Sequence, residues 1–225
     1  MVFSPTDSVV GVDGCAGGWF AVWSTTSDGL NSGCYETFAA VVDEHDTADR
    51  ILVDMPIGLP DSDSRTCDEE ARKQLGLRKN SVFPVPCREG VEYWKREGET
   101  ATYERAKEIN REHLDSALSV QSWNIVPKIG EIDRYLENKP HTIDIIESHP
   151  ECCFTALNDG YPLAQSKSTA IGRAARFGVL DGELDGWQAC YEAALDDYYR
   201  NAVARDDIVD AMVLLAAGRH MLTPL

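Results

Sequence analysis

VVGVDGCAGGW, residues 9–19, is the stretch that decides the fold of this chain. Its apolar run leads into Asp13, and the glycines that follow permit the positive φ angles of a tight return. The apolar pattern resumes at residues 19–23, which predicts a buried strand carrying Asp13 and then the second strand of a hairpin. A single Asp beside glycine more often marks an ordinary turn, so a functional interpretation depends on the pattern recurring.

The pattern recurs at two later strands. Residues 50–54 form an apolar run that ends in Asp54, and the prolines and glycine of the following MPIGLP force the chain out of the sheet. Residues 142–147 form a third run, which ends in Glu147. If these strands are neighbours, the three acids meet at one edge of the sheet. Like charges there raise one another's pKa unless a cation compensates.

A C-terminal helix, predicted over residues 205–221, brings further acids. Asp207 and Asp210 are spaced i, i+3 and share one helical face, and we expect Asp206 to be the N-cap. Small and apolar residues at 211, 214, 215 and 218 suit close packing on a sheet. Acids in a first turn also suit the helix dipole without any further role. Clustered carboxylates favour Mg²⁺ or Mn²⁺ over zinc.

The remaining elements indicate an α/β chain with a helical insertion. A turn at 27–29 precedes a third strand at 34–38, and a short helix follows at 39–48. Residues 61–137 contain no convincing strand, and the predicted elements there are helices at 64–75, 101–118 and 123–136 and a proline-rich link at 81–86. A further amphipathic helix is expected at 187–203. We expect a single domain over residues 1–225.

Composition excludes several classes of protein. The seven cysteines include no C-x-x-C pair, which argues against a zinc ribbon or a disulfide framework and favours small core residues in a reducing compartment. No N-terminal signal and no apolar run of about twenty residues is present, so a cytoplasmic protein without membrane contact is expected. The chain has 38 acidic and 21 basic residues, which gives a net charge of −17. Such an acidic surface is typical of proteins from a halophilic cytoplasm. It disfavours nonspecific binding to polyanions at low salt.

The order of elements is that of the ribonuclease H-like fold, a mixed five-stranded sheet flanked by helices, here with the insertion between strands 4 and 5. Six motifs together resemble the domain-of-unknown-function 429 (DUF429) family, described as predicted RNase H-like nucleases. They are GVDGCAGGW (11–19), VDMPIGLP (53–60), SVFPVP (81–86), PKIGEID (127–133), IESHPE (146–151) and DDIVDA (206–211). The family's function rests on its fold, which is an analogy rather than a property of a site.

The resemblance implies a nuclease that hydrolyses phosphodiester bonds with two Mg²⁺ or Mn²⁺ ions. It implies Asp13, Asp54 and Asp210 as metal ligands, with Glu147 and Asp207 beside them holding a water or carrying a proton. The implied substrate is RNA or DNA, structured forms included. The candidate substrate contacts are Arg78, Lys79, Phe83, Arg88, Lys128 and Lys167. A lone lysine or a helical charge mixture is most often only a solvated surface.

Two other functions stay open. A glycine-rich turn after a strand-end Asp also occurs in actin-like ATP-dependent phosphotransferases, but those chains repeat the module and this one has a single copy. The other alternative is a catalytically idle binding or scaffold protein of the same fold, which the net charge of −17 favours. Retention of all the acids disfavours it, because a carboxylate cluster without a metal costs stability.

Overall fold

The computed structural model describes residues 8–25, 29–138 and 143–220. Its described residues form two compact units, one from Met1–Met55 with Pro140–Pro224 and the other from Pro56–Lys139. The first unit contains the sheet, and the second contributes helices that fall between strands 4 and 5 in sequence. The single domain over residues 1–225, with an insertion at about 61–137, stays a prediction.

The first unit is built on a five-stranded mixed sheet in the order β3-β2-β1-β4-β5. The strands are β1 (Val9–Cys15), β2 (Gly18–Thr25), β3 (Gly29–Tyr35), β4 (Arg50–Val53) and β5 (Asp144–Glu147). The first three strands are antiparallel, whereas β4 and β5 run parallel to β1. The predicted α/β class and mixed sheet are confirmed, and this sheet is consistent with the ribonuclease H-like fold.

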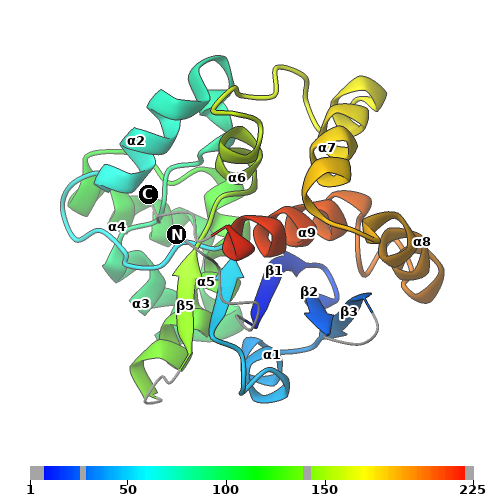
Figure 1. The fold of residues 1–225 in the computed structure, drawn as a ribbon. Helices are drawn as coiled ribbons and strands as arrows, with labels where there is room; N and C mark the ends of the chain where they lie inside the picture. The colour runs from blue at the N-terminus through cyan, green and yellow to red at the C-terminus, as the bar shows by residue number, and fades with distance from the viewer. Residues whose placement is uncertain (1–7, 26–28, 139–142, 221–225) are drawn as a thin grey trace. The chain divides into compact units, whose positions relative to one another are not determined.

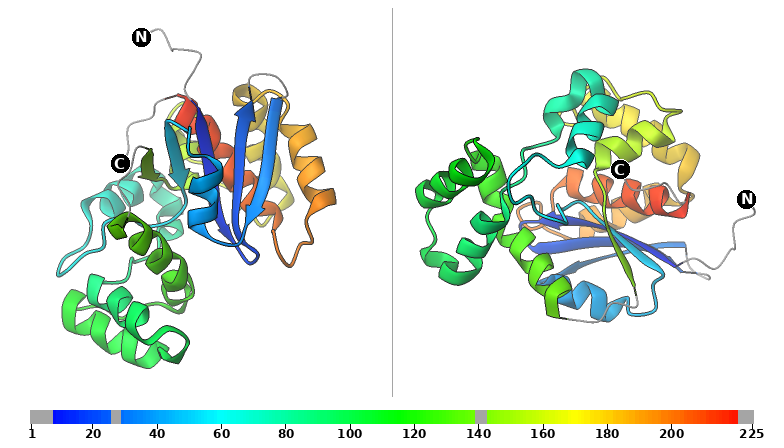
Figure 2. Two further views of the ribbon diagram at one scale, coloured as in Figure 1. Left: turned by 90° about the horizontal axis from the view of Figure 1, so that it is seen from below. Right: turned by 90° about the vertical axis from the view of Figure 1, so that its left-hand side faces the viewer.

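Helix α9 (Arg205–Arg219) lies against β1 on one face of the sheet, and α1 (Phe38–Glu44) covers the other face (Figure 2). Every residue of α9 from Ile208 to Gly218 is buried. Close contact requires glycine on the strand, because a Cβ atom at Gly11 would lie 2.1 Å from the Ala211 carbonyl oxygen. Side chains alternate across a strand, so Asp13 is on the same face as Gly11 and is directed towards α9.

Three more helices pack beside α9 in the first unit (Figure 1). They are α6 (Pro150–Leu157), α7 (Ala170–Glu183) and α8 (Trp187–Asp197). The apolar core that these helices share includes Phe154, Leu180 and Trp187. A buried ion pair between Arg176 and Glu151 links α7 to α6, and the Arg176 guanidinium also lies over the Phe154 ring. These contacts fix the chain on either side of the segment between α6 and α7.

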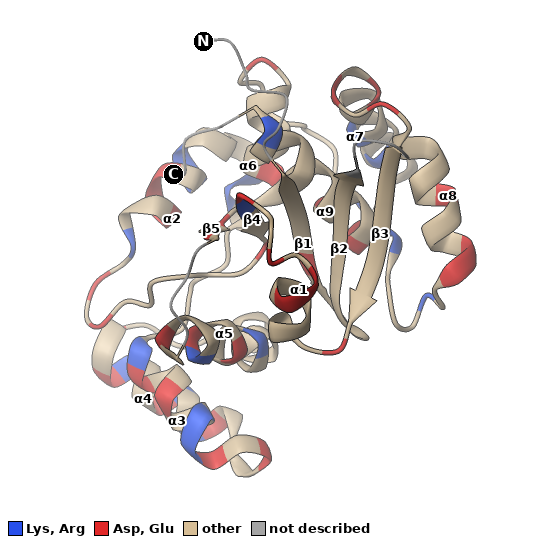
Figure 3. Ribbon diagram, turned by 60° about the horizontal axis from the view of Figure 1, so that its bottom comes forward, with Lys and Arg blue, Asp and Glu red and all other residues tan. Residues whose placement is uncertain are grey.

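The described residues of the second unit contain helices and no strand. The helices are α2 (Thr66–Leu75), η1 (Gly76–Ser81), α3 (Arg88–Glu97), η2 (Gly98–Thr100), α4 (Tyr103–Leu114) and α5 (Val120–Asn138). Buried polar groups join them, as when the Asn110 Oδ1 atom accepts from the Cys87 amide at 2.9 Å. Acidic and basic residues are mixed on α3, α4 and α5 (Figure 3).

Several sequence predictions of element boundaries were wrong. The third strand was expected at 34–38, but β3 ends at Tyr35 because Thr37 caps α1 by accepting from the Ala40 amide at 3.2 Å. The helix expected to reach residue 203 ends at Asp197. Helices α3, α6 and α7 were not predicted, and most of the expected turn at 27–29 falls outside the described residues.

Within the described ranges, no helix has the length and apolar character needed to span a membrane.

Replacing Gly11 by alanine is expected to lower the free energy of unfolding by about 1–3 kcal/mol, because the new methyl group overlaps the α9 backbone. Gly178, inside α7, is the matched control, since a Cβ atom there meets nothing within 4 Å. Gly178→Ala should raise the free energy by roughly 0.5–1 kcal/mol through helix propensity. Urea unfolding of both variants measures the difference. A Gly11→Ala protein as stable as the native chain would refute the close contact.

Candidate metal centre

Three aspartates from separate elements meet at one edge of the sheet. Asp13 is on β1, Asp54 directly follows β4, and Asp210 is in the second turn of α9. Each offers a carboxylate oxygen, and the three oxygens lie within 4.8 Å of one another. Asp13 and Asp210 are only 8% and 2% exposed, and Asp54 is half-buried. The parallel pairing of β1 with β4 brings the first two together, and the contact between α9 and β1 adds the third.

Glu147 and Asp207 lie beside this group but are not members of it. Glu147 ends β5 opposite Val53, where its charge raises the pKa of Asp54. The Asp207 Oδ2 atom accepts from the Ala204 amide at 2.8 Å and so caps α9. The expectation that Asp206 is the N-cap was wrong, because the helix begins at Arg205 and the third residue of its first turn supplies the capping carboxylate.

The charges of the aspartates are incompletely compensated. Burial raises the pKa of Asp13 well above its ordinary value, and the charges of Asp54 and Asp210 raise it further. Burial, with neighbouring acids, raises the pKa of Asp54 and that of Asp207 to about 6. Burial also raises the pKa of Asp210, although Lys167 opposes the shift. A further cation would therefore be stabilised at this edge.

Lys167 brings a basic side chain to this edge of the sheet. Its Nζ atom lies 2.6 Å from Asp210 Oδ2 and 3.4 Å from Asp206 Oδ2. Burial alone would lower the pKa of Lys167, but Asp210, Asp206 and Asp13 together raise it above its ordinary value. Among the residues that the structure describes, no other lysine or arginine forms an ion pair with Asp13, Asp54 or Asp210.

The other candidate substrate contacts belong to the second unit. Lys79 and Phe83 are exposed there, while Arg78 and Lys128 are half-buried. Arg88 instead donates to both carboxylate oxygens of Asp133, at 2.7 Å each. The roles of these residues in substrate binding stay predictions.

Sequence reasoning missed a histidine and the residues that hold Lys167. His149, two residues after Glu147, lowers the pKa of Asp54. Its position two residues after a strand-end acid, in IESHPE, was the available signal. Thr169 and Arg176, which fix the segment around Lys167, form their contacts only in the folded chain and leave no sequence pattern.

The cysteines near the aspartates do not suit metal binding. Cys152 and Cys153 are buried in α6, and burial raises the pKa of the Cys152 thiol to about 12. Cys15 on β1 is also buried, and its thiol pKa is likewise raised to about 12. Because a metal binds the thiolate, these thiols are poor ligands at neutral pH. All seven cysteines are free, and five are buried, as expected of small core residues.

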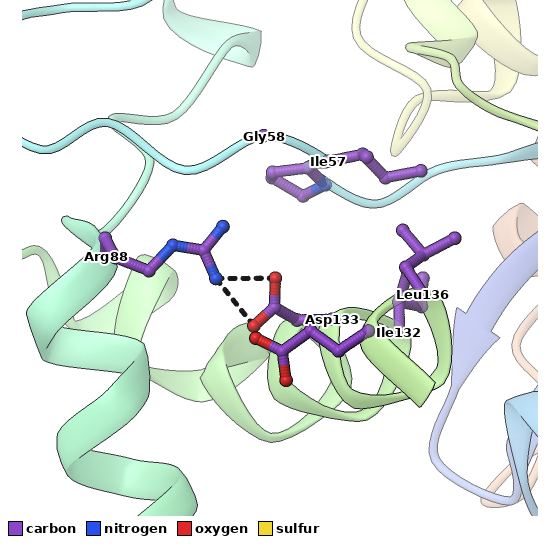
Figure 4. Close-up of a pocket in the computed structure, with 8 residues that line it drawn as sticks. Ile57, Gly58, Arg88, Ile132, Asp133 and Leu136 are labelled. Carbon is purple, nitrogen blue, oxygen red and sulfur yellow. Dashed lines mark hydrogen bonds and ion pairs between the residues drawn. The ribbon is translucent and has the colours of Figure 1, made fainter. Parts of the chain in front are cut away.

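A second carboxylate group, in the second unit, is compensated by its own bases. Glu92, Asp133 and Glu137 surround the Lys95 Nζ atom at 2.8–2.9 Å. Arg88 donates to Asp133 from the edge of a cavity of about 360 Å³ lined by α5 and residues 56–58 (Figure 4). Although burial opposes it, hydrogen bonds from Lys95 and Arg88 lower the pKa of Asp133. This ion network is explained by packing of α3 on α5.

Lys95→Met is expected to lower the free energy of unfolding by roughly 1–3 kcal/mol, because three carboxylates then share a single base. The Lys95 side chain is 9% exposed, whereas that of Lys73, paired with Glu70, is 68% exposed. Lys73→Met is therefore the matched control and should change stability little. Urea unfolding compares the two. Equal effects would show that Lys95 is only a surface charge.

The stability of the metal-free protein is expected to fall as pH rises from about 4 to 7. Asp54 and Asp207 have pKa values of about 6 in the folded protein, above the ordinary 3.8, so protonation stabilises the fold at low pH and this stabilisation is lost through that range. Asp54→Asn removes one such group. The free energy of unfolding of this variant should exceed that of the native chain by about 1–3 kcal/mol near pH 7.5 and should differ little from it near pH 4.

Urea unfolding in the presence of a chelator measures this pH dependence. The exposed Asp46→Asn variant removes the same charge away from the site and serves as the control. Identical pH profiles for Asp54→Asn and Asp46→Asn would contradict the proposed charge repulsion.

Comparison with known proteins gives a family. The family model described as "Protein of unknown function (DUF429)" matches residues 11–223, a span that includes Asp13, Asp54, Lys167 and Asp210. No curated protein and no solved structure matches the chain. Because the family model covers nearly the whole sequence, from β1 to beyond α9, the chain belongs to the DUF429 family.

Proposed function

We propose that this protein is a divalent-metal-dependent hydrolase of phosphodiester bonds, with Asp13, Asp54 and Asp210 as the metal ligands. The observation that carries the proposal is the meeting of three carboxylate oxygens within 4.8 Å, two of them on buried side chains. Burying like charges together costs free energy unless a cation compensates them, and Lys167 supplies one positive charge against three negative ones.

The donor set fits Mg²⁺ or Mn²⁺. All three donors are hard carboxylate oxygens, and the nearby cysteines are protonated thiols at neutral pH. Asp13, Asp54 and Asp210 would hold the ion, which would lower the pKa of a bound water molecule and stabilise charge on the leaving 3′ oxygen. The resemblance to RNase H-like proteins implies two ions. Asp207, with a pKa of about 6, is suited to exchange a proton near neutral pH. We assign to Glu147, which ends β5 opposite Val53 beside Asp54, the role of orienting a water molecule.

Nucleic acid is the substrate class that we propose. Residues 71–88 support it, because they contain five lysines and arginines and no acid in a chain whose net charge is −17. Within this segment, Lys79 and Phe83 are exposed and offer a phosphate contact and a stacking surface. Arg88 is the least available of the candidates because it is bonded to Asp133.

A binding or scaffold protein without catalysis is the second candidate, and the net charge of −17 favours it. It predicts that the aspartates bind no divalent ion and that no phosphodiester is cleaved. An actin-like phosphotransferase would instead be stabilised against heat by ATP. The midpoint of thermal unfolding, measured with ATP and with Mn²⁺ alone, separates these alternatives from the hydrolase. A phosphotransferase is stabilised by ATP, a scaffold protein by neither, and the hydrolase by Mn²⁺ alone.

Asp13→Asn should reduce metal-dependent hydrolysis to background. The substitution removes one of the three proposed metal ligands, the one on β1 against which α9 packs. Hydrolysis is measured with Mg²⁺ and Mn²⁺ at high salt on bis(4-nitrophenyl) phosphate, single-stranded RNA and DNA, RNA·DNA hybrids and branched DNA. The small diester reports the chemistry without base contacts, and Asp46→Asn is the control that should keep full activity. Undiminished activity in Asp13→Asn would eliminate the proposed centre.

A further inference from the structure

Lys167 takes up carboxylate oxygens that a second metal ion would need. Its ammonium lies 2.6 Å from Asp210 Oδ2, which is hydrogen-bond distance. Asp207, a further acid in the first turn of α9, already uses its Oδ2 atom to cap the helix. A Mg²⁺ ion requires oxygen ligands at about 2.0–2.1 Å. An ion bound by these two oxygens would therefore displace the ammonium and the helix cap.

The backbone on both sides of Lys167 is anchored to α7. The Ser166 carbonyl accepts from the Thr169 hydroxyl at 2.9 Å, and a Cβ atom at Gly172 would lie 2.0 Å from the same oxygen. On the other side, the Ser168 carbonyl accepts from Arg173 at 3.1 Å. The buried Arg176, paired with Glu151, donates to the Gln165 carbonyl at 3.2 Å. The segment is therefore arranged to hold the ammonium at this position.

The charges of the group leave room for one divalent ion. Lys95, in the second unit, bonds to all three acids around it, so that group needs no further cation. Lys167 pairs with Asp210 and Asp206, whereas in the described part of the chain neither Asp13 nor Asp54 forms an ion pair with a lysine or arginine. One ammonium and one divalent ion equal in charge the three carboxylates of Asp13, Asp54 and Asp210. The Asp206 side chain is 50% exposed, so solvent screens its charge and it is not counted here.

We propose that this centre holds a single divalent ion, bound by Asp13, Asp54 and Asp210, and that the Lys167 ammonium occupies the place of a second ion. Lys167 then supplies positive charge to a substrate phosphate without a second metal. This inference rests on the proposed function and replaces the two ions implied by the family resemblance with one ion and one lysine.

The test is the stoichiometry of Mn²⁺ binding to the full chain. It is measured by calorimetry and by electron paramagnetic resonance at high salt, with and without dimethyl phosphate as a diester that lacks bases. The variants are Lys167→Ala, Lys167→Arg and Asp13→Asn, and Arg200→Ala, which removes an exposed positive charge elsewhere, is the control. Circular dichroism verifies that each variant is folded.

One ion per native chain is expected under both conditions, as for Lys167→Arg and Arg200→Ala. Lys167→Ala should bind two ions, the first roughly tenfold more tightly because a nearby positive charge is gone. Two ions in the native protein, both lost in Asp13→Asn, would overturn the inference and leave the proposed function intact. One ion of unchanged affinity in Lys167→Ala would also overturn it. No binding by the native chain would overturn the proposed function as well.

Discussion

The close contact between α9 and β1 is the constraint on which the centre depends. Gly11 gives the helix backbone room to approach the strand, and Asp13 follows two residues later on the same strand face. Asp210 is one residue before Ala211, whose carbonyl faces Gly11, so the contact that completes the core also joins the two buried acids. The hydrophobic packing of α9 thus offsets the cost of bringing like charges together.

Two groups of three carboxylates in the described part of the chain, one in each unit, show how charge balance separates structure from function. Around Lys95, each acid has a basic partner and the group holds α3 against α5. Around Asp13, burial and mutual repulsion raise the aspartate pKa values even though Lys167 is present. The same residue types therefore form a closed ion network in one unit and a site with an unmet demand for positive charge in the other.

The sequence was sufficient to locate the strands that carry or precede Asp13, Asp54 and Glu147, because an apolar run that stops at an acid is a local signal, although β1 continues past Asp13 to Cys15. The sequence was insufficient where tertiary contacts determine whether an element forms and where it begins. Strand β3 contains glycine, asparagine and serine, and it forms because it pairs with β2. Helix α6 is buried on most sides, so its apolar residues do not follow a helical period. Helix α7 contains three glycines, which lower its helix propensity. Asp207 rather than Asp206 caps α9 because the helix starts at Arg205, and local propensity does not fix a start to one residue.

The most direct test of the centre is the anomalous scattering of crystals grown with Mn²⁺. The contact between α9 and β1, with the carboxylates that it assembles, predicts a manganese peak within coordination distance of Asp13, Asp54 and Asp210, with the Lys167 ammonium beside Asp210. Saturating Mn²⁺ that produces no peak at these three aspartates, or a peak only at Glu92, Asp133 and Glu137, would contradict the assignment of this edge of the sheet as the metal centre.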